Sequence, residues 1–188
     1  MQTPSEWLRQ AGARRAAYEV ICITCTSVIF LISSYGIVAS IFGHIDVVGA
    51  TLVNVDLSPI AFPVTIQPVA VLMAAALGLT FSGLELAKPM FLNRSHTTYT
   101  LIRFVAFVGT ALAAYEVMYN FAIWTAEIST NSLLGLLNPD FLTNQFPNPK
   151  TPWNLVFATE LSTTLLAIGM YVFYFIRQVE RTKIEMMT

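Results

Sequence analysis

The stretch LIRFVAFVGTALAAYEVMYNFAIWTAEI, residues 101–128, decides the fold class. At about 1.5 Å per residue, a helix of this length crosses the roughly 30 Å hydrocarbon core of a membrane. The bulky apolar residues Phe107, Met118 and Phe121 fall on one side of such a helix. The small and polar residues fall within about 60° of Glu116 on the other side, and they are Gly109, Ala113, Glu116, Asn120 and Glu127. This pattern predicts a membrane helix whose polar side contacts protein.

Glu116 lies near the middle of this stretch. An ionised carboxylate at that depth costs several kcal/mol unless it is partnered or neutralised. The sequence therefore predicts that a neighbouring helix, of this chain or of another subunit, satisfies Glu116.

The composition assigns the whole chain to the integral membrane proteins. Hydrophobic residues make up 55% of it and charged residues only 11%, against about 25% charged residues in ordinary soluble domains. We expect residues 1–188 to form a single membrane domain whose partners are membrane proteins and lipids rather than nucleic acid. Cys22 and Cys25 lie inside the first apolar stretch, which excludes a disulfide framework and favours small residues at a helix contact.

Four spans are predicted, at about residues 20–42, 66–86, 101–128 and 153–176, and they give an all-α, integral membrane four-helix bundle. The first helix should begin near Pro4, because Pro is favoured at the first helical position. Two longer outer loops are expected at residues 43–62 and 130–151, and a short polar loop at residues 88–100. Thr151 and Pro152 are the expected start of the fourth helix.

The basic residues predict the orientation. Nine of the ten Lys and Arg residues lie on one side of the predicted membrane, and only Lys150 lies on the other. Basic residues mark the cytoplasmic side, so both termini are expected in the cytoplasm and the protein is expected to be a multi-pass protein of the cytoplasmic membrane.

The histidine content argues against a cofactor held by this chain. His44 and His96 are the only two histidines, and both fall in predicted loops on opposite sides of the membrane. A haem between helices needs an axial His at membrane depth, and copper or non-haem iron sites use two or three His. A metal on His44 and Asp46, completed by another subunit, is the less favoured alternative. No catalytic motif is present, so we expect no cofactor and no enzymatic activity of the chain by itself.

Two interpretations remain open for the carboxylates within the predicted spans. The favoured one is structural, with hydrogen bonds between helices or to partner subunits. The alternative is a proton or cation path through Glu116 and Glu160, as in a small proton- or cation-coupled transporter. The candidate residues for helix packing or subunit contact are Glu116, Asn120, Gly109, Glu160, Gly78 and Glu85.

The segment PWNLVFAT, residues 152–159, follows an outer loop rich in Asn and Pro at residues 138–150. Over roughly the last quarter of the chain it resembles small four-span membrane proteins of ammonia-oxidising archaea, some of which are proposed as accessory subunits of the archaeal ammonia monooxygenase. The resemblance implies a non-catalytic subunit packed around a membrane-bound, copper-dependent oxidoreductase, with the copper bound by partner subunits.

Overall fold

The computed structural model describes residues 4–42, 52, 67–133 and 155–187. They form the helices α1 (Pro4–Phe42), α3 (Pro68–Leu92), α4 (His96–Leu133) and α6 (Leu155–Met187). Each of the four contains a segment long and apolar enough to cross a membrane. The predicted all-α fold with four spanning helices is therefore confirmed, and the first helix begins at Pro4 as predicted.

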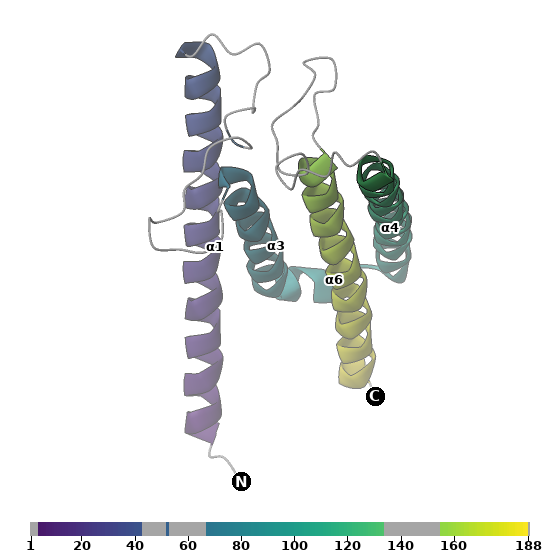
Figure 1. Ribbon diagram of the computed structural model, residues 1–188. Helices are drawn as coiled ribbons and strands as arrows, with labels where there is room; N and C mark the ends of the chain where they lie inside the picture. The colour runs from purple at the N-terminus through teal and green to yellow at the C-terminus, as the bar shows by residue number, and fades with distance from the viewer. Residues whose placement is uncertain (1–3, 43–51, 53–66, 134–154, 188) are drawn as a thin grey trace.

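The helices stand side by side in an order that differs from their order in the chain (Figure 1). The extensive contacts join α1 to α3, α3 to α6 and α6 to α4. The last helix thus lies between α3 and α4, although these two are consecutive and are joined by a turn of only three residues, 93–95. The N- and C-termini lie at the same end of the molecule (Figure 1), which we call the inner end because the sequence assigns it to the cytoplasm.

Three helix ends extend beyond the predicted spans. The predicted polar loop at residues 88–100 is wrong, because α3 continues to Leu92 and α4 begins at His96. The predicted outer loop from residue 130 starts too early, since α4 runs to Leu133. The fourth span was predicted to end at residue 176, yet α6 continues to Met187. The rest of both outer loops and the predicted cap at Thr151 lie outside the described residues.

The longer helix ends have a physical cause, which is packing at the inner end. Tyr99 of α4 is buried against Phe175, Ile176 and Val179 of α6. Apolar residues that are partly buried surround this cluster, and they are Leu84, Phe91, Leu92, Ile102, Tyr171 and Val172. Tertiary contacts therefore hold the helices together beyond the stretch that hydropathy alone identifies.

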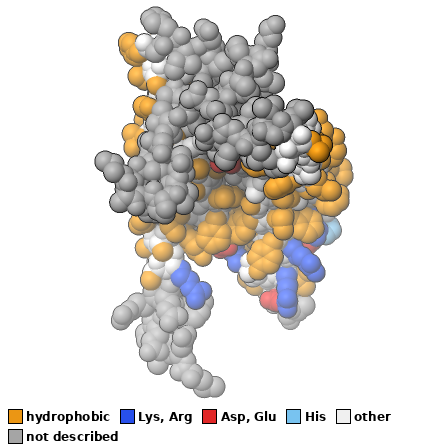
Figure 2. Space-filling model, in the orientation of Figure 1, with side chains coloured by type: hydrophobic (Ala, Val, Ile, Leu, Met, Phe, Trp, Pro, Cys, Tyr) orange, Lys and Arg blue, Asp and Glu red, His pale blue; other side chains and the backbone are white. Residues whose placement is uncertain are grey.

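Apolar side chains cover much of the visible surface of the described residues, and basic side chains gather toward the inner end (Figure 2). The predicted lipid-facing residues of α4 are exposed: Phe107 by 61%, Met118 by 73% and Phe121 by 57%. A broad exposed apolar surface is what a membrane protein presents to lipid or to membrane partners.

Two glycines mark the closest approaches between helices. A Cβ atom added to Gly78 of α3 would lie 2.6 Å from the Sγ of Cys25 in α1. A Cβ atom added to Gly169 of α6 would overlap the hydroxyl oxygen of Thr110 in α4. Each helix pair packs closely at these points because one of its residues has no side chain.

Candidate functional site

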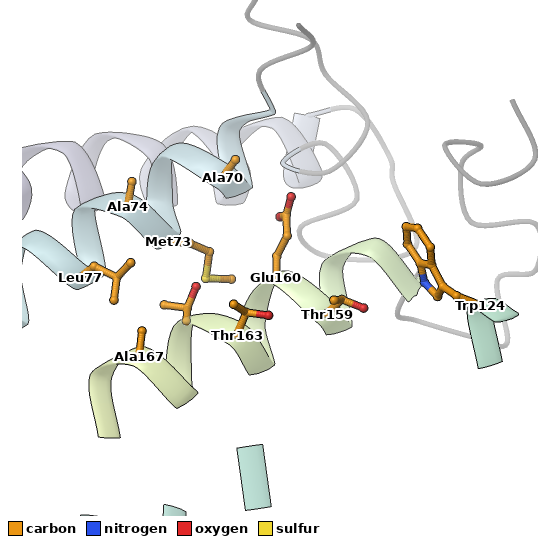
Figure 3. A pocket seen from close by; sticks show the side chains of 10 residues that line it. Ala70, Met73, Ala74, Leu77, Trp124, Thr159, Glu160, Thr163 and Ala167 are labelled. Carbon is orange, nitrogen blue, oxygen red and sulfur yellow. The ribbon is translucent and has the colours of Figure 1, made fainter. Parts of the chain in front are cut away.

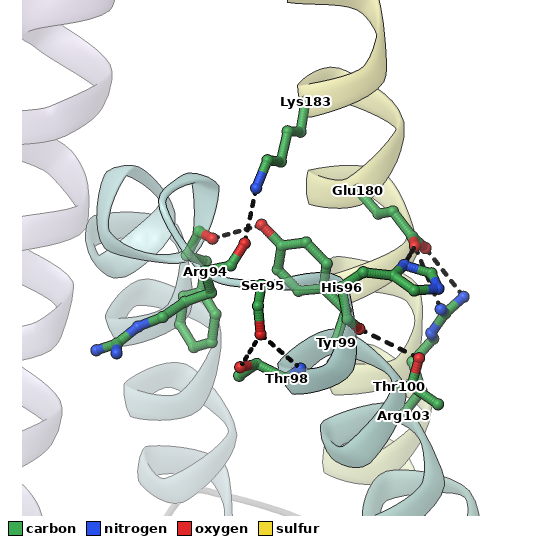
Figure 4. A network of polar contacts seen from close by, with 10 residues as sticks. Arg94, Ser95, His96, Thr98, Tyr99, Thr100, Arg103, Glu180 and Lys183 are labelled. Carbon is green, nitrogen blue, oxygen red and sulfur yellow. Dashed lines mark hydrogen bonds and ion pairs between the residues drawn. The ribbon is translucent and has the colours of Figure 1, made fainter.

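The turn between α3 and α4 is fixed to α6 by polar contacts (Figure 4). Ser95 precedes α4, and its Oγ accepts a hydrogen bond from the Thr98 amide at 3.3 Å, as an N-capping residue does. The Lys183 Nζ donates to the Arg94 carbonyl at 2.7 Å and lies 5.7 Å from the centre of the Tyr99 ring. The Tyr99 hydroxyl donates to the Phe91 carbonyl at 2.5 Å.

Glu180 of α6 is the charged centre of this inner region. Its Oε2 lies 3.0 Å from Arg103 Nη1 and its Oε1 lies 2.8 Å from His96 Nδ1. Both Arg103 and His96 belong to α4, so a single carboxylate holds the inner ends of the two helices in register (Figure 4). His96, expected in a loop, is thus the first residue of a helix and the partner of an acid.

This pairing sets a depth scale for the two helices. Trp124 lies 21 residues along α4 from Arg103, and Glu160 lies 20 residues along α6 from Glu180. At about 1.5 Å per residue, both intervals are about 30 Å, the thickness of a hydrocarbon core. Because the helices are antiparallel, Trp124 and Glu160 reach the same level at the outer end. Glu160 is therefore near the outer boundary of the membrane rather than at mid-depth.

A cavity of about 480 Å³ opens at that outer level between α3 and α6 (Figure 3). We call it the outer groove. Its walls are mostly apolar, and Glu160 and Trp124 are its largest polar side chains. Neither the Oε2 of Glu160 nor the Nε1 of Trp124 has a hydrogen-bond partner, although both atoms are buried. The lining residues are Ala70, Met73, Ala74, Leu77, Trp124, Thr159, Glu160, Thr163, Thr164 and Ala167.

Three of the predicted contact residues lie between helices of the chain. Glu85 of α3 accepts a hydrogen bond from the Tyr171 hydroxyl of α6 at 3.0 Å. Gly78 faces Cys25 of α1. Asn120 of α4 is only 4% exposed, and its Nδ2 has no hydrogen-bond partner. These residues contribute to packing within the subunit.

Glu116 and Gly109 lie elsewhere. Both are exposed, and no hydrogen bond or ion pair to Glu116 is found among the described residues. A Cβ atom added to Gly109 would meet nothing within 4 Å. The contact face of α4 passes through Ala113 and Asn120, so it is rotated by about 60–80° from Glu116. The polar side predicted from the sequence is therefore divided, with one edge against α6 and the other free.

The described residues contain no group of three or more His, Cys, Asp or Glu side chains that could hold a metal ion. His44 and Asp46, the alternative metal ligands, lie outside the described residues. No family model, curated protein or solved structure matches the chain. The functional argument therefore rests on the exposed edge of α4 and on the outer groove.

The sequence alone did not identify the outer groove, the Glu180 pairing or the approach at Gly169. Trp124 carried a signal, since a Trp at the end of a span is typical of the membrane interface. Arg103 and Glu180 also carried one, because each stands about 20 residues before or after the outer end of its helix. Gly169 stands in the segment LLAIGMYVFY, residues 165–174, which has no second small residue at the GxxxG spacing of close helix pairs.

Proposed function

We propose that this chain is a non-catalytic accessory subunit of a membrane-bound oxidoreductase complex. The resemblance of residues 152–159 favours the archaeal copper-dependent ammonia monooxygenase as that complex. The copper would then belong to partner subunits, and this chain would contribute assembly and packing within the membrane.

The observation that carries the proposal is the free edge of α4 around Glu116. Glu116 is eight residues from Trp124 and thirteen from Arg103, which places it about 12 Å below the outer level and about 20 Å above the inner one. A charged residue at mid-membrane costs about 2.5–3.5 kcal/mol on insertion scales. A hydrogen bond from a helix of another subunit recovers about 1–2 kcal/mol of this, and Gly109, on the same edge, lets that helix come close.

The alternative is a proton- or cation-coupled transporter that uses Glu116 and Glu160. Such a path needs the two carboxyl groups to share one polar route. Glu160 lines the outer groove, whereas Glu116 is not among the residues that line it, and it is exposed on another helix. This arrangement favours the accessory subunit over the transporter.

Purification from gently solubilised membranes, followed by native mass analysis, tests the proposal. We expect the wild-type chain to co-purify with oxidoreductase subunits. Replacing Glu116 by Gln keeps its shape and its hydrogen-bonding capacity, so Glu116→Gln should assemble and function normally. Glu116→Leu and Gly109→Ile should weaken the complex about 5–30-fold. Ala111 is exposed on the opposite side of α4, so Ala111→Ile is the matched control and should leave the complex intact.

Two results would overturn the proposal. One is a wild-type chain that purifies only as a monomer or homo-oligomer. The other is a Glu116→Gln variant that assembles fully yet abolishes activity, because a titratable proton would then be essential and the transporter would be the better explanation.

A further inference from the structure

The outer groove combines two polar atoms of opposite hydrogen-bonding character with apolar walls. A carboxyl oxygen of Glu160 accepts hydrogen bonds, and the indole N–H of Trp124 only donates them. Both atoms are buried, and neither has a partner among the described residues. A buried polar atom without a partner costs about 1–3 kcal/mol, so two of them at one cavity need an explanation.

The other carboxyl group at a helix contact, Glu85, is satisfied within the subunit by the Tyr171 hydroxyl. The remaining buried atom without a partner, Asn120 Nδ2, does not line the groove. Glu160 and Trp124 thus differ from both, because each is unpartnered and each lines a cavity of about 480 Å³. This volume lies within the range of about 300–1,000 Å³ that is usual for small-molecule sites.

The two atoms specify the polar group of a ligand. An ether or ester oxygen accepts from Trp124 but offers Glu160 nothing. An alkylammonium donates to Glu160 but leaves the indole N–H without an acceptor. A hydroxyl group both donates and accepts, so it satisfies the two sides together.

The rest of the groove specifies an apolar body. Met73, Leu77 and Ala167 form part of its wall, and Ala74, Thr163 and Ala167 are exposed. The groove is thus open at the side, toward the bilayer. In Figure 3, Glu160 and Trp124 lie toward one end of the groove and Leu77 and Ala167 toward the other. A ligand would place its polar end at the outer boundary and its chain toward the membrane interior.

We propose that the outer groove binds an amphiphile with an apolar chain and a terminal hydroxyl group, which enters from the bilayer. The hydroxyl donates to Glu160 and accepts from Trp124. This inference is independent of the proposed function, because it concerns only residues of this chain and requires no partner subunit.

Tryptophan emission of the purified full-length chain in detergent tests the proposal. The chain has three tryptophans, so replacing Trp7 and Trp153 by Phe leaves Trp124 as the only one. The probe is 1-decanol, compared with decane, methyl decyl ether and decylamine at matched mole fractions in the micelle. Binding is read as the change in the emission of Trp124.

We expect 1-decanol to half-saturate at a concentration about 5–10-fold lower than the other three probes, because each of these lacks at least one hydrogen bond. Glu160→Gln keeps an acceptor oxygen and should retain this preference. Glu160→Leu should bind 1-decanol no better than decane. The comparison among probes needs no change at Glu160, so it decides the matter even if Glu160→Leu does not fold.

Three results would refute the site. Equal binding of 1-decanol and decane would make the groove a purely apolar surface. Tighter binding of decylamine than of 1-decanol would assign an ammonium ligand instead. An emission spectrum that none of the four probes changes would mean that the groove binds no amphiphile of this kind.

Discussion

Replacing Gly169 by Ala tests how closely α4 and α6 pack. The new methyl group would overlap the Thr110 hydroxyl oxygen, and it would also lie 3.3 Å from the Thr110 Cβ and 3.5 Å from the Ala106 carbonyl oxygen. The Thr110 hydroxyl donates to that carbonyl at 2.6 Å, so it cannot swing away without losing its bond. The two helices must then move apart along the most extensive contact in the molecule.

Overpacking of this kind costs about 1–3 kcal/mol of unfolding free energy. For a chain of this size that corresponds to a melting temperature lower by roughly 2–12 °C. The matched control is Gly83→Ala in α3, where an added Cβ meets nothing within 4 Å. Because Ala is up to about 1 kcal/mol better than Gly in a helix interior, this control should be neutral or stabilising. The two Gly→Ala changes should therefore have opposite signs.

The assay is thermal unfolding of the purified chain, followed by loss of helical circular dichroism in one detergent. A double-mutant cycle with Thr110→Ala identifies the cause, since removing the hydroxyl should restore at least half of the stability lost in Gly169→Ala. If Gly169→Ala and Gly83→Ala unfolded at the same temperature, or if Thr110→Ala gave no rescue, the close approach of α4 and α6 would be disproved.

Three further predictions concern other parts of the chain. Glu180→Leu should lower the unfolding free energy by about 1–3 kcal/mol, measured by the same assay, since Arg103 and Glu180 are only 28% and 17% exposed and Arg103 would lose its charged partner; an unchanged melting temperature would contradict it. A cysteine introduced at Ser132, exposed in the last turn of α4, should react with a membrane-impermeant reagent in intact cells, and reaction only after lysis would reverse the topology. Metal analysis of the isolated chain should find no stoichiometric haem, copper or iron, and copper at one equivalent would direct attention to His44 and Asp46.

The membrane class and the number of spans were predictable because they depend on local composition. Long apolar stretches give spanning helices whatever their neighbours are. The ends of the helices depend on tertiary contacts instead. Val179 and Glu180 lie past the end of the predicted fourth span, and only their contacts with Tyr99 and Arg103 of α4 explain why α6 continues.

The division of the polar side of α4 was not predictable from the sequence. Gly109, Ala113, Glu116 and Asn120 have the same pattern whether they face a helix of the same chain or of another subunit, because small and polar residues mark both kinds of contact. The structure separates Ala113 and Asn120, which are buried, from Gly109 and Glu116, which are exposed. The outer groove was not predictable either, since it depends on the relative depth of Trp124 and Glu160 on two helices.

The position of α6 between α3 and α4 has a consequence for biosynthesis. During translation, α3 and α4 leave the ribosome as a hairpin closed by residues 93–95, before their common neighbour exists. The main packing partner of α4 is supplied only by the last 34 residues, 155–188. A nascent chain that stops short of them carries three apolar helices but not the carboxylate that pairs with Arg103. The C-terminal helix is thus the closing piece of the subunit, and a chain truncated there would present cellular quality control with an unpaired Arg103 at the cytoplasmic surface.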